Sequence, residues 1–167
     1  IPPPVALRFD VQGLGRRTVS ADDRDVGGPP FQILDVHAHV GKPNYAYRAP
    51  EFTNEDLAAR MKASDVSLCC VFSFYDVQDN PYVEQSARGR KDLVPFAFLN
   101  PKHADAAATL DRLITTQGFR GLKLHPVTTI AHPGGVDTIR LVRRTAEHGW
   151  PTLAHCADEQ LCTPLAW

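Results

Sequence analysis

The amino-acid sequence predicts an α/β fold in which parallel β-strands alternate with α-helices. Three observations support this prediction. Apolar segments of strand length recur about every 30 residues. Segments with the helical spacing of apolar residues lie between them. The clearest strand segment is apolar almost throughout, as is typical of a parallel strand buried on both faces.

Five segments have the composition of strands. Asn100-Pro101 and His125-Pro126 end two of them. In chain order the five segments are Phe31–Val36, Val66–Phe74, Leu93–Leu99, Arg120–Leu124 and Pro151–His155. Because strands and helices alternate along the chain, the sheet is expected to be parallel.

Four helices are predicted between these strands. The first begins at Thr53, which suits an N-cap because Asp56 follows three residues later. Gly118 and Gly149 fit the position just after a helix end. The other three helices are Pro81–Arg90, Ala104–Thr116 and Val136–His148.

Residues 1–30 are predicted to form an irregular leader, and residues 31–167 the folded domain. The leader mixes proline, glycine and charged residues without a sustained period, apart from a short strand near Val5–Phe9. The charged run 22–25 followed by glycines and prolines is typical of an exposed connection.

The composition argues against several classes of protein. A net charge of -1 gives no indication of a nucleic-acid partner or an anionic membrane surface. The sequence has no apolar run of membrane-spanning length, and its first residues lack the pattern of a signal peptide. Cys69 and Cys70 are expected to be small buried hydrophobes, and the cysteine spacings match no zinc finger or redox pair. These features favour a reducing, cytoplasmic location.

The stretch from Asp35 to His39 carries the strongest chemical signal. Alternate residues of a strand share a face, so Asp35, His37 and His39 are predicted to lie on one side. Two imidazoles at i and i+2 can bind a single divalent cation such as zinc. The plainer interpretation is that they are two surface histidines at a strand end.

Further polar residues follow the other predicted strands. Lys123 and His125 end the fourth strand at i and i+2, and His155 ends the fifth. In an α/β barrel the carboxyl ends of the strands hold the active site. Individually, Lys123 could instead extend its ammonium to water, Asn100 suits a turn, and Asp76 a solvated loop.

The number of strands leaves two architectures open. A (β/α)8 barrel needs about 250 residues, so this chain covers only about the first five β/α units of one. The alternative is an open α/β sheet in its own right. No glycine-rich nucleotide loop follows the first strand, which weakens a nucleotide-binding interpretation.

Four stretches together resemble the amidohydrolase-related family of the metal-dependent hydrolase superfamily. The resemblance covers about residues 31–157. The stretches are Asp35-Val36-His37-Ala38-His39, Asn100-Pro101-Lys102, the run from Gly118 to Pro126, and the run from Pro151 to Cys156. The family includes decarboxylases that act on carboxylated aromatic or small dienoic acids.

The resemblance implies a distorted (β/α)8 TIM barrel with one divalent metal, usually zinc, at its C-terminal mouth. It implies that His37, His39 and His155 are metal ligands. It also implies that Lys123 and His125 lie near the substrate, where they could hold a carboxylate. Family members carry a further histidine after strand six and a catalytic aspartate after strand eight, and both positions lie beyond residue 167. The catalytic residues are therefore unknown.

Three functional hypotheses follow. The first is a metal-dependent hydrolase or carboxy-lyase acting on a small carboxylated, amide or lactone substrate. The second is a catalytically inactive half-barrel remnant that at most binds metal or a partner. The third is an open α/β protein that binds a small acid without metal. An unclosed barrel exposes strand edges, so association with another copy is also expected.

Overall fold

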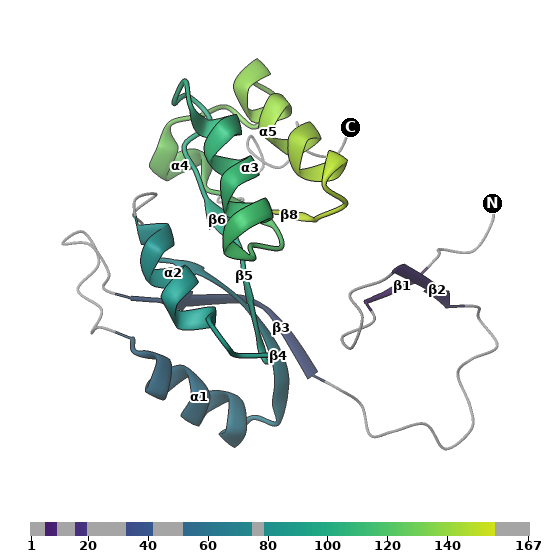
Figure 1. The fold of residues 1–167 in the computed structure, drawn as a ribbon, viewed down its shortest axis with the longest axis vertical. Coiled ribbons are helices and arrows are strands. Elements are labelled where there is room, and N and C mark those ends of the chain that lie inside the picture. Colours follow the sequence, from purple (N-terminus) through teal and green to yellow (C-terminus); the bar gives the residue numbers. More distant parts are fainter. Residues whose placement is uncertain (1–5, 10–15, 20–32, 42–51, 75–78, 156–167) are drawn as a thin grey trace. The chain divides into compact units, whose positions relative to one another are not determined.

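The computed structural model describes residues 6–9, 16–19, 33–41, 52–74 and 79–155 (Figure 1). The chain divides into two units, Ile1–Phe31 and Gln32–Trp167. In the first unit, β1 (Ala6–Phe9) pairs with β2 (Arg16–Val19) in antiparallel fashion. The leader was expected to be irregular with one short strand, so the second strand of this hairpin corrects that expectation.

The second unit contains two three-stranded parallel sheets (Figure 1). The first has the order β3 (Ile33–Val40), β4 (Val66–Ser73), β5 (Leu93–Pro95). The second has the order β6 (Ala97–Phe98), β7 (Leu122–Leu124), β8 (Thr152–Ala154). Within each sheet, every strand therefore pairs with the next one in the chain, as β/α crossover connections produce.

The predicted strand Leu93–Leu99 is divided between the two sheets. Pro95 has no N–H to donate, and the hydrogen bonding changes sides at this point. The N–H of Phe96 donates to the carbonyl of Val71 at 2.8 Å, whereas the N–H of Ala97 donates to the carbonyl of Gly121 at 2.9 Å. The backbone around Phe96 therefore connects β4 on one side with β7 on the other.

Five helices are found among the described residues: α1 (Asn54–Ala63), α2 (Asn80–Ala87), α3 (Ala106–Gln117), α4 (Pro126–Thr129) and α5 (Val136–Glu147). The capping box at Thr53 is confirmed, since Asp56 N–H donates to the Thr53 hydroxyl and Thr53 N–H to the Asp56 carboxylate. Gly118 ends α3 with φ +74°. The short α4 was not predicted. None of the helices described is long and apolar enough to cross a membrane.

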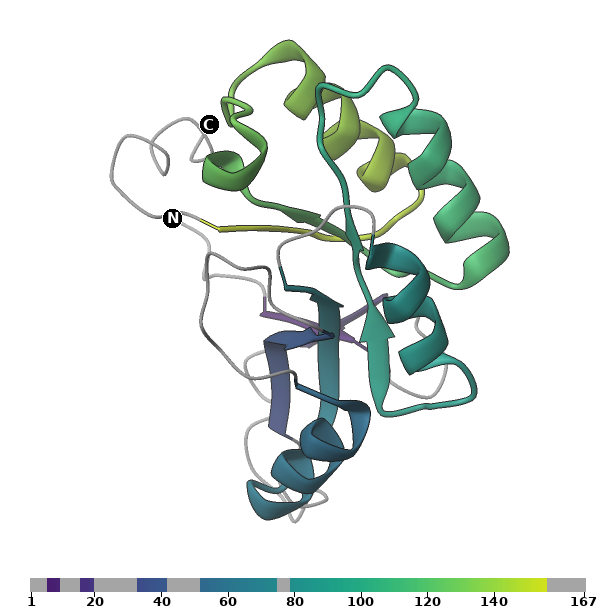
Figure 2. The same ribbon diagram turned by 90° about the vertical axis from the view of Figure 1, so that its left-hand side faces the viewer.

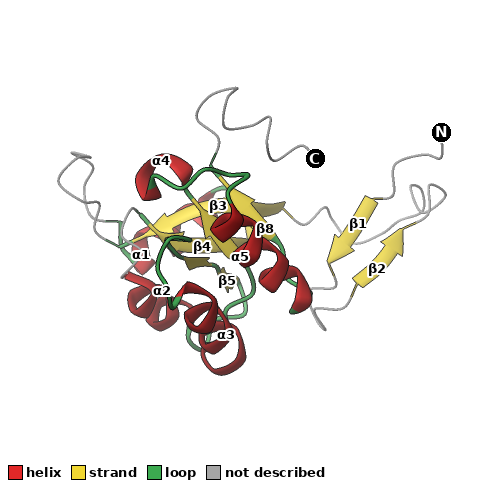
Figure 3. Cartoon of the chain, turned by 90° about the horizontal axis from the view of Figure 1, so that it is seen from above, coloured by secondary structure: helices red, strands yellow, loops and turns green. Residues whose placement is uncertain are grey.

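Helices α1, α2 and α5 pack against the strands. Helices α1 and α2 contact β4, α2 also contacts β5, and α5 contacts β8. Seen from above, α1, α2 and α3 line one side of the strands (Figure 3). Val71, Leu110 and Leu122 are fully buried in the core between these layers. The other face of the strands carries a separate apolar cluster of Cys70, Phe72 and Phe96, and it is this face that holds the candidate site.

Strand β3 has an exposed apolar edge. Within the described residues it pairs only with β4 in its sheet (Figure 2). The side chains of Ile33, Leu34 and Val36 are 46%, 39% and 51% exposed. Exposed apolar side chains on an unpaired strand edge favour association with further strands.

Candidate metal and substrate site

His37 and His39 lie inside β3, which continues to Val40 rather than ending at Val36 as predicted. Their rings meet edge to edge, with 3.2 Å between the two Nε2 atoms. Nδ1 of His39 is 2.9 Å from the backbone carbonyl of Ser73. A carbonyl oxygen can only accept, so Nδ1 carries the proton and Nε2 keeps its lone pair.

Strand β3 contains a bulge just before His39. Asp35 lies opposite Cys69 and Ala38 opposite Val71, so β3 contains one more residue than β4 between these pairs. A one-residue shift reverses the faces of a strand. The prediction that Asp35 shares a face with His39 is therefore wrong. The Asp35 carboxylate instead accepts the backbone N–H of His37 at 2.9 Å.

Phe72 contacts both the two histidines of β3 and Lys123 of β7. Its fully buried ring lies edge-on to both imidazoles, with centroids 5.0 Å from His37 and 4.6 Å from His39. Nζ of Lys123 lies over the same ring, 4.5 Å from its centroid. Lys123 is 0% exposed, which excludes the alternative of a lysine that reaches into water. Sequence reasoning treated Phe72 only as part of an apolar strand.

His125 and His155 also come together, but in a different geometry. Their rings stack face to face, with centroids 4.1 Å apart and an interplanar angle of 8°. The backbone N–H of His155 donates to the carbonyl of Leu124, which aligns the ends of β7 and β8. Among the described residues, no group of three or more His, Cys, Asp or Glu side chains converges on a point where it could hold a metal ion.

All four imidazoles have pKa values lowered from the usual value of a histidine. Burial is the largest cause for each, and the positive charge of Lys123 adds to it. Burial lowers the pKa of His39 and of His125 to about 4. These rings are therefore neutral near pH 7, the form in which a histidine nitrogen can bind a metal ion.

The histidine pair on β3 fits a divalent cation. A zinc ion binds histidine nitrogens at about 2.0–2.1 Å, with N–Zn–N angles between a right angle and the tetrahedral angle. Two nitrogens bound in this way lie roughly 2.9–3.4 Å apart. The 3.2 Å separation of the two Nε2 atoms falls within that range. The Ser73 carbonyl supplies the outer hydrogen bond that metal-binding histidines usually make.

The other residues identified in the sequence have simpler environments. The Asn100 carboxamide accepts the N–H of Lys102, which is a turn contact. Cys69 and Cys70 are buried free thiols, and burial raises their pKa values to about 12 and 11. Asp76, Cys156 and Cys162 lie outside the described residues.

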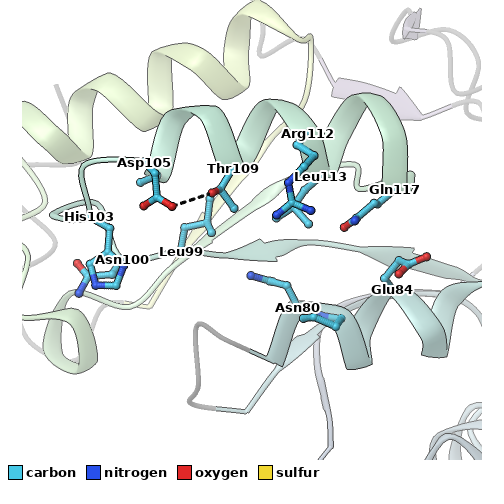
Figure 4. A pocket seen from close by; sticks show the side chains of 12 residues that line it. Asn80, Glu84, Leu99, Asn100, His103, Asp105, Thr109, Arg112, Leu113 and Gln117 are labelled. Carbon is cyan, nitrogen blue, oxygen red and sulfur yellow. Dashed lines mark hydrogen bonds between the residues drawn. The ribbon is translucent and has the colours of Figure 1, made fainter.

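A polar cleft of about 300 Å³ lies between α2 and α3 (Figure 4). Glu84 and Arg112 line it, and none of the five predicted site residues does. Asn80, which also lines it, makes hydrogen bonds to both backbone groups of Phe98. The amide of Asn80 thus fastens α2 to β6, which is a structural role.

The geometry defines a parallel α/β protein with histidines gathered toward the carboxyl ends of its strands. A family model described as amidohydrolase matches residues 34–166. The chain therefore belongs to the amidohydrolase family, whose members are generally metal-dependent hydrolases. No curated protein matches the chain.

Solved structures share the fold, and three of them follow. One is assigned as a 2-pyrone-4,6-dicarboxylic acid hydrolase from Acinetobacter baumannii with citric acid bound; it has a TM-score of 0.61 and 17% identity over 81% of this chain and 54% of that one. An amidohydrolase II has a TM-score of 0.64 and 17% identity over 77% and 52%. A protein assigned as an amidohydrolase from Staphylococcus aureus has a TM-score of 0.63 and 14% identity over 76% and 48%. The chain spans about half the length of these structures.

Proposed function

We propose that the chain supplies the first five β/α units and the metal-binding strand of a metal-dependent hydrolase or carboxy-lyase that acts on a small carboxylated substrate. Family membership supports a hydrolase. The order of the parallel strands supports the front part of a (β/α)8 barrel. The carboxy-lyase form differs from the hydrolase form in its substrate.

The observation that carries the proposal is the convergence of His37 and His39. Their Nε2 atoms lie 3.2 Å apart, and the Ser73 carbonyl fixes the proton of His39 on the far nitrogen. Two neutral imidazoles arranged in this way form half of a tetrahedral site. We assign His155 as the third ligand by resemblance, and zinc as the preferred ion.

A bound divalent ion would lower the pKa of a coordinated water or polarise a carbonyl or carboxylate of the substrate. The chain's own residues have separate tasks. Lys123 provides a buried cation that attracts a carboxylate. His125 provides a neutral polar ring beside it. Phe72 presents an apolar surface beside Lys123 and the histidine pair.

Metal content is the test of this proposal. The purified chain is loaded with zinc, manganese or cobalt, freed of excess ion and analysed by mass spectrometry. We expect about one ion per parent chain and a near-complete loss in the double variant His37→Ala/His39→Ala. The matched control is His103→Ala/His132→Ala, which removes two exposed histidines and should bind metal as the parent does.

The outcomes separate the parts of the proposal. Equal metal in the parent and in the His37→Ala/His39→Ala variant would place the ion elsewhere and refute the site. Loss of metal in His155→Ala would support its assignment as third ligand, whereas unchanged affinity would remove it from the site. With metal bound, 2-pyrone-4,6-dicarboxylate is the first substrate to assay, because a structure with the same fold is assigned to its hydrolysis.

A second candidate is a catalytically inactive half-barrel that at most binds metal or a partner. The exposed Ile33, Leu34 and Val36 on the edge of β3 favour it, because such an edge pairs readily with another chain. Sedimentation of the chain over a range of concentrations tests association. Replacing Val36 with lysine should weaken any association and leave metal binding intact.

A further inference from the structure

The imidazole of His125 caps the short helix α4. The backbone N–H of Thr128 donates to Nδ1 of His125 at 3.3 Å. A backbone N–H can only donate, so Nδ1 must hold a lone pair. A protonated imidazolium has no such lone pair. The ring is therefore neutral, with its single proton on Nε2.

The rest of the structure holds this ring in place. Both the N–H and the hydroxyl of Thr129 donate to the carbonyl of His125 at 3.0 Å, which fixes its backbone. The ring stacks on His155 at 4.1 Å, and the residue is only 6% exposed. Turning the ring over would break the bond to Thr128 and leave a helix N–H without its cap.

His39 has the opposite arrangement. Its Nδ1 faces the carbonyl of Ser73, so its Nε2 has a lone pair that can bind a cation or accept a proton. His125 has its lone pair occupied at Nδ1 and an N–H at Nε2. The Nε2 atom of His125 is therefore a hydrogen-bond donor, whereas the Nε2 atom of His39 is an acceptor.

We propose that His125 is a substrate-specificity residue that donates a hydrogen bond from Nε2–H to a carboxylate oxygen beside Lys123, and that it is not a general base. The identity of the substrate rests on the proposed function, whereas the position of the proton does not. A neutral donor next to a buried cation recognises an anionic oxygen, and it would leave an apolar isostere of the carboxylate unbound.

The first test is the position of the proton. Long-range 1H–15N spectra of the chain labelled with 15N-histidine distinguish the two tautomers of each ring, and single variants assign the signals. We expect Nε2–H for His125 and Nδ1–H for His39. His132 is an internal reference, because the N–H of Gly134 donates to its Nδ1 at 3.1 Å and should give the same tautomer as in His125. A His125 ring protonated at Nδ1 overturns the proposal.

The second test separates the two ends of the ring. Asparagine at 125 keeps an acceptor for the N–H of Thr128, since it is a good N-cap, but it has no donor at the far end. Glutamine at 125 reaches the Nε2 position with an amide donor. Benzoate is the probe and benzyl alcohol its uncharged counterpart, both measured by calorimetry on the full chain.

We expect His125→Asn to bind benzoate about 10–100-fold more weakly than the parent, with an unchanged melting temperature, because a bond to a charged group is lost. His125→Gln should recover most of that affinity. Unchanged affinity in His125→Asn, equal losses in both variants, or a parent that does not bind benzoate each overturns the proposal. Failure of metal binding with the expected tautomer and benzoate results would refute the proposed function alone.

Discussion

The two histidine pairs of the site differ in how their rings meet. On β3, His37 and His39 point their Nε2 atoms at each other, 3.2 Å apart. At the ends of β7 and β8, His125 and His155 stack face to face at 4.1 Å. Residues at i and i+2 of one strand can direct their ring edges to one point, which suits a cation. Residues on adjacent strands lie side by side, which favours stacking.

The comparison shows that burial alone does not assign a role to a histidine. Burial lowers the pKa of His39 and of His125 to the same value, about 4. What distinguishes the two rings is the backbone atom at Nδ1, a carbonyl from Ser73 in one and an N–H from Thr128 in the other. The carbonyl leaves a lone pair on Nε2 of His39, whereas the N–H leaves a proton on Nε2 of His125.

The substitution Phe72→Ala should have the largest effect, because it removes a ring that touches the histidine pair of β3 and Lys123 of β7. Phe72 is fully buried and contacts His37, His39 and Lys123. Emptying such a position costs about 3–5 kcal/mol of the free energy of unfolding, measured by urea denaturation. Phe72→Leu is the control, since it keeps most of the apolar volume. Equal stability of Phe72→Ala and the parent would contradict this packing.

Local patterns in the sequence predicted much of the fold. The apolar run Val66–Phe74 is β4 almost residue for residue. The capping box at Thr53 and the glycine after α3 were identified from neighbouring residues, because the hydrogen bonds that they make span only a few positions. The division at Pro95 was missed, since it depends on hydrogen bonds to two different strands.

The site was predictable only in its residue types. The i, i+2 spacing predicted that His37 and His39 would meet, and their rings do. The bulge that moves Asp35 to the other face depends on the register with β4, which no local pattern encodes. The tautomer of His39 depends on the carbonyl of Ser73, 34 residues away. Contacts of that separation cannot be read from spacing.

The substitution Gly121→Ala should disturb the histidine pair at the ends of β7 and β8 and leave the pair on β3 in place. A methyl group at Gly121 would collide with the ring of Phe96, which is 5% exposed and cannot move aside. Overpacking of this kind costs about 1–3 kcal/mol of unfolding free energy. Adding Phe96→Leu should recover part of the loss, and a double-mutant cycle measures that coupling. Additive effects would show that the two positions do not touch.

The substitution Ile130→Gly should stabilise the chain, by about 0.5–1 kcal/mol. Ile130 ends α4 with φ +51° and is 78% exposed, so a β-branched residue is strained there while its side chain buries little. Relief of this strain would strengthen the turn that holds His125 and leave the β3 pair unchanged. Val127→Gly is the matched control within α4 and should destabilise. Thermal unfolding of both variants decides the sign.

The smallest effect should come from acid titration of Asp111, which lies in the helix layer and provides a reference away from both histidine pairs. Arg144 of α5 binds the two carboxylate oxygens of Asp111 at 2.7 and 2.8 Å, His148 adds a third contact, and these bonds hold the pKa of Asp111 at about 2. The unfolded chain binds this proton near pH 3.9, so the stabilisation is complete above about pH 4 and is lost as the pH falls toward 2. Asp111→Asn should flatten the decline of the urea midpoint across that window. The control is Asp137→Asn. The Asp137 carboxylate pairs with Arg140 within α5, so its loss should leave the link between α3 and α5 intact. An unchanged slope in Asp111→Asn would mean that the partly exposed pair is screened by water and contributes little to joining the helices.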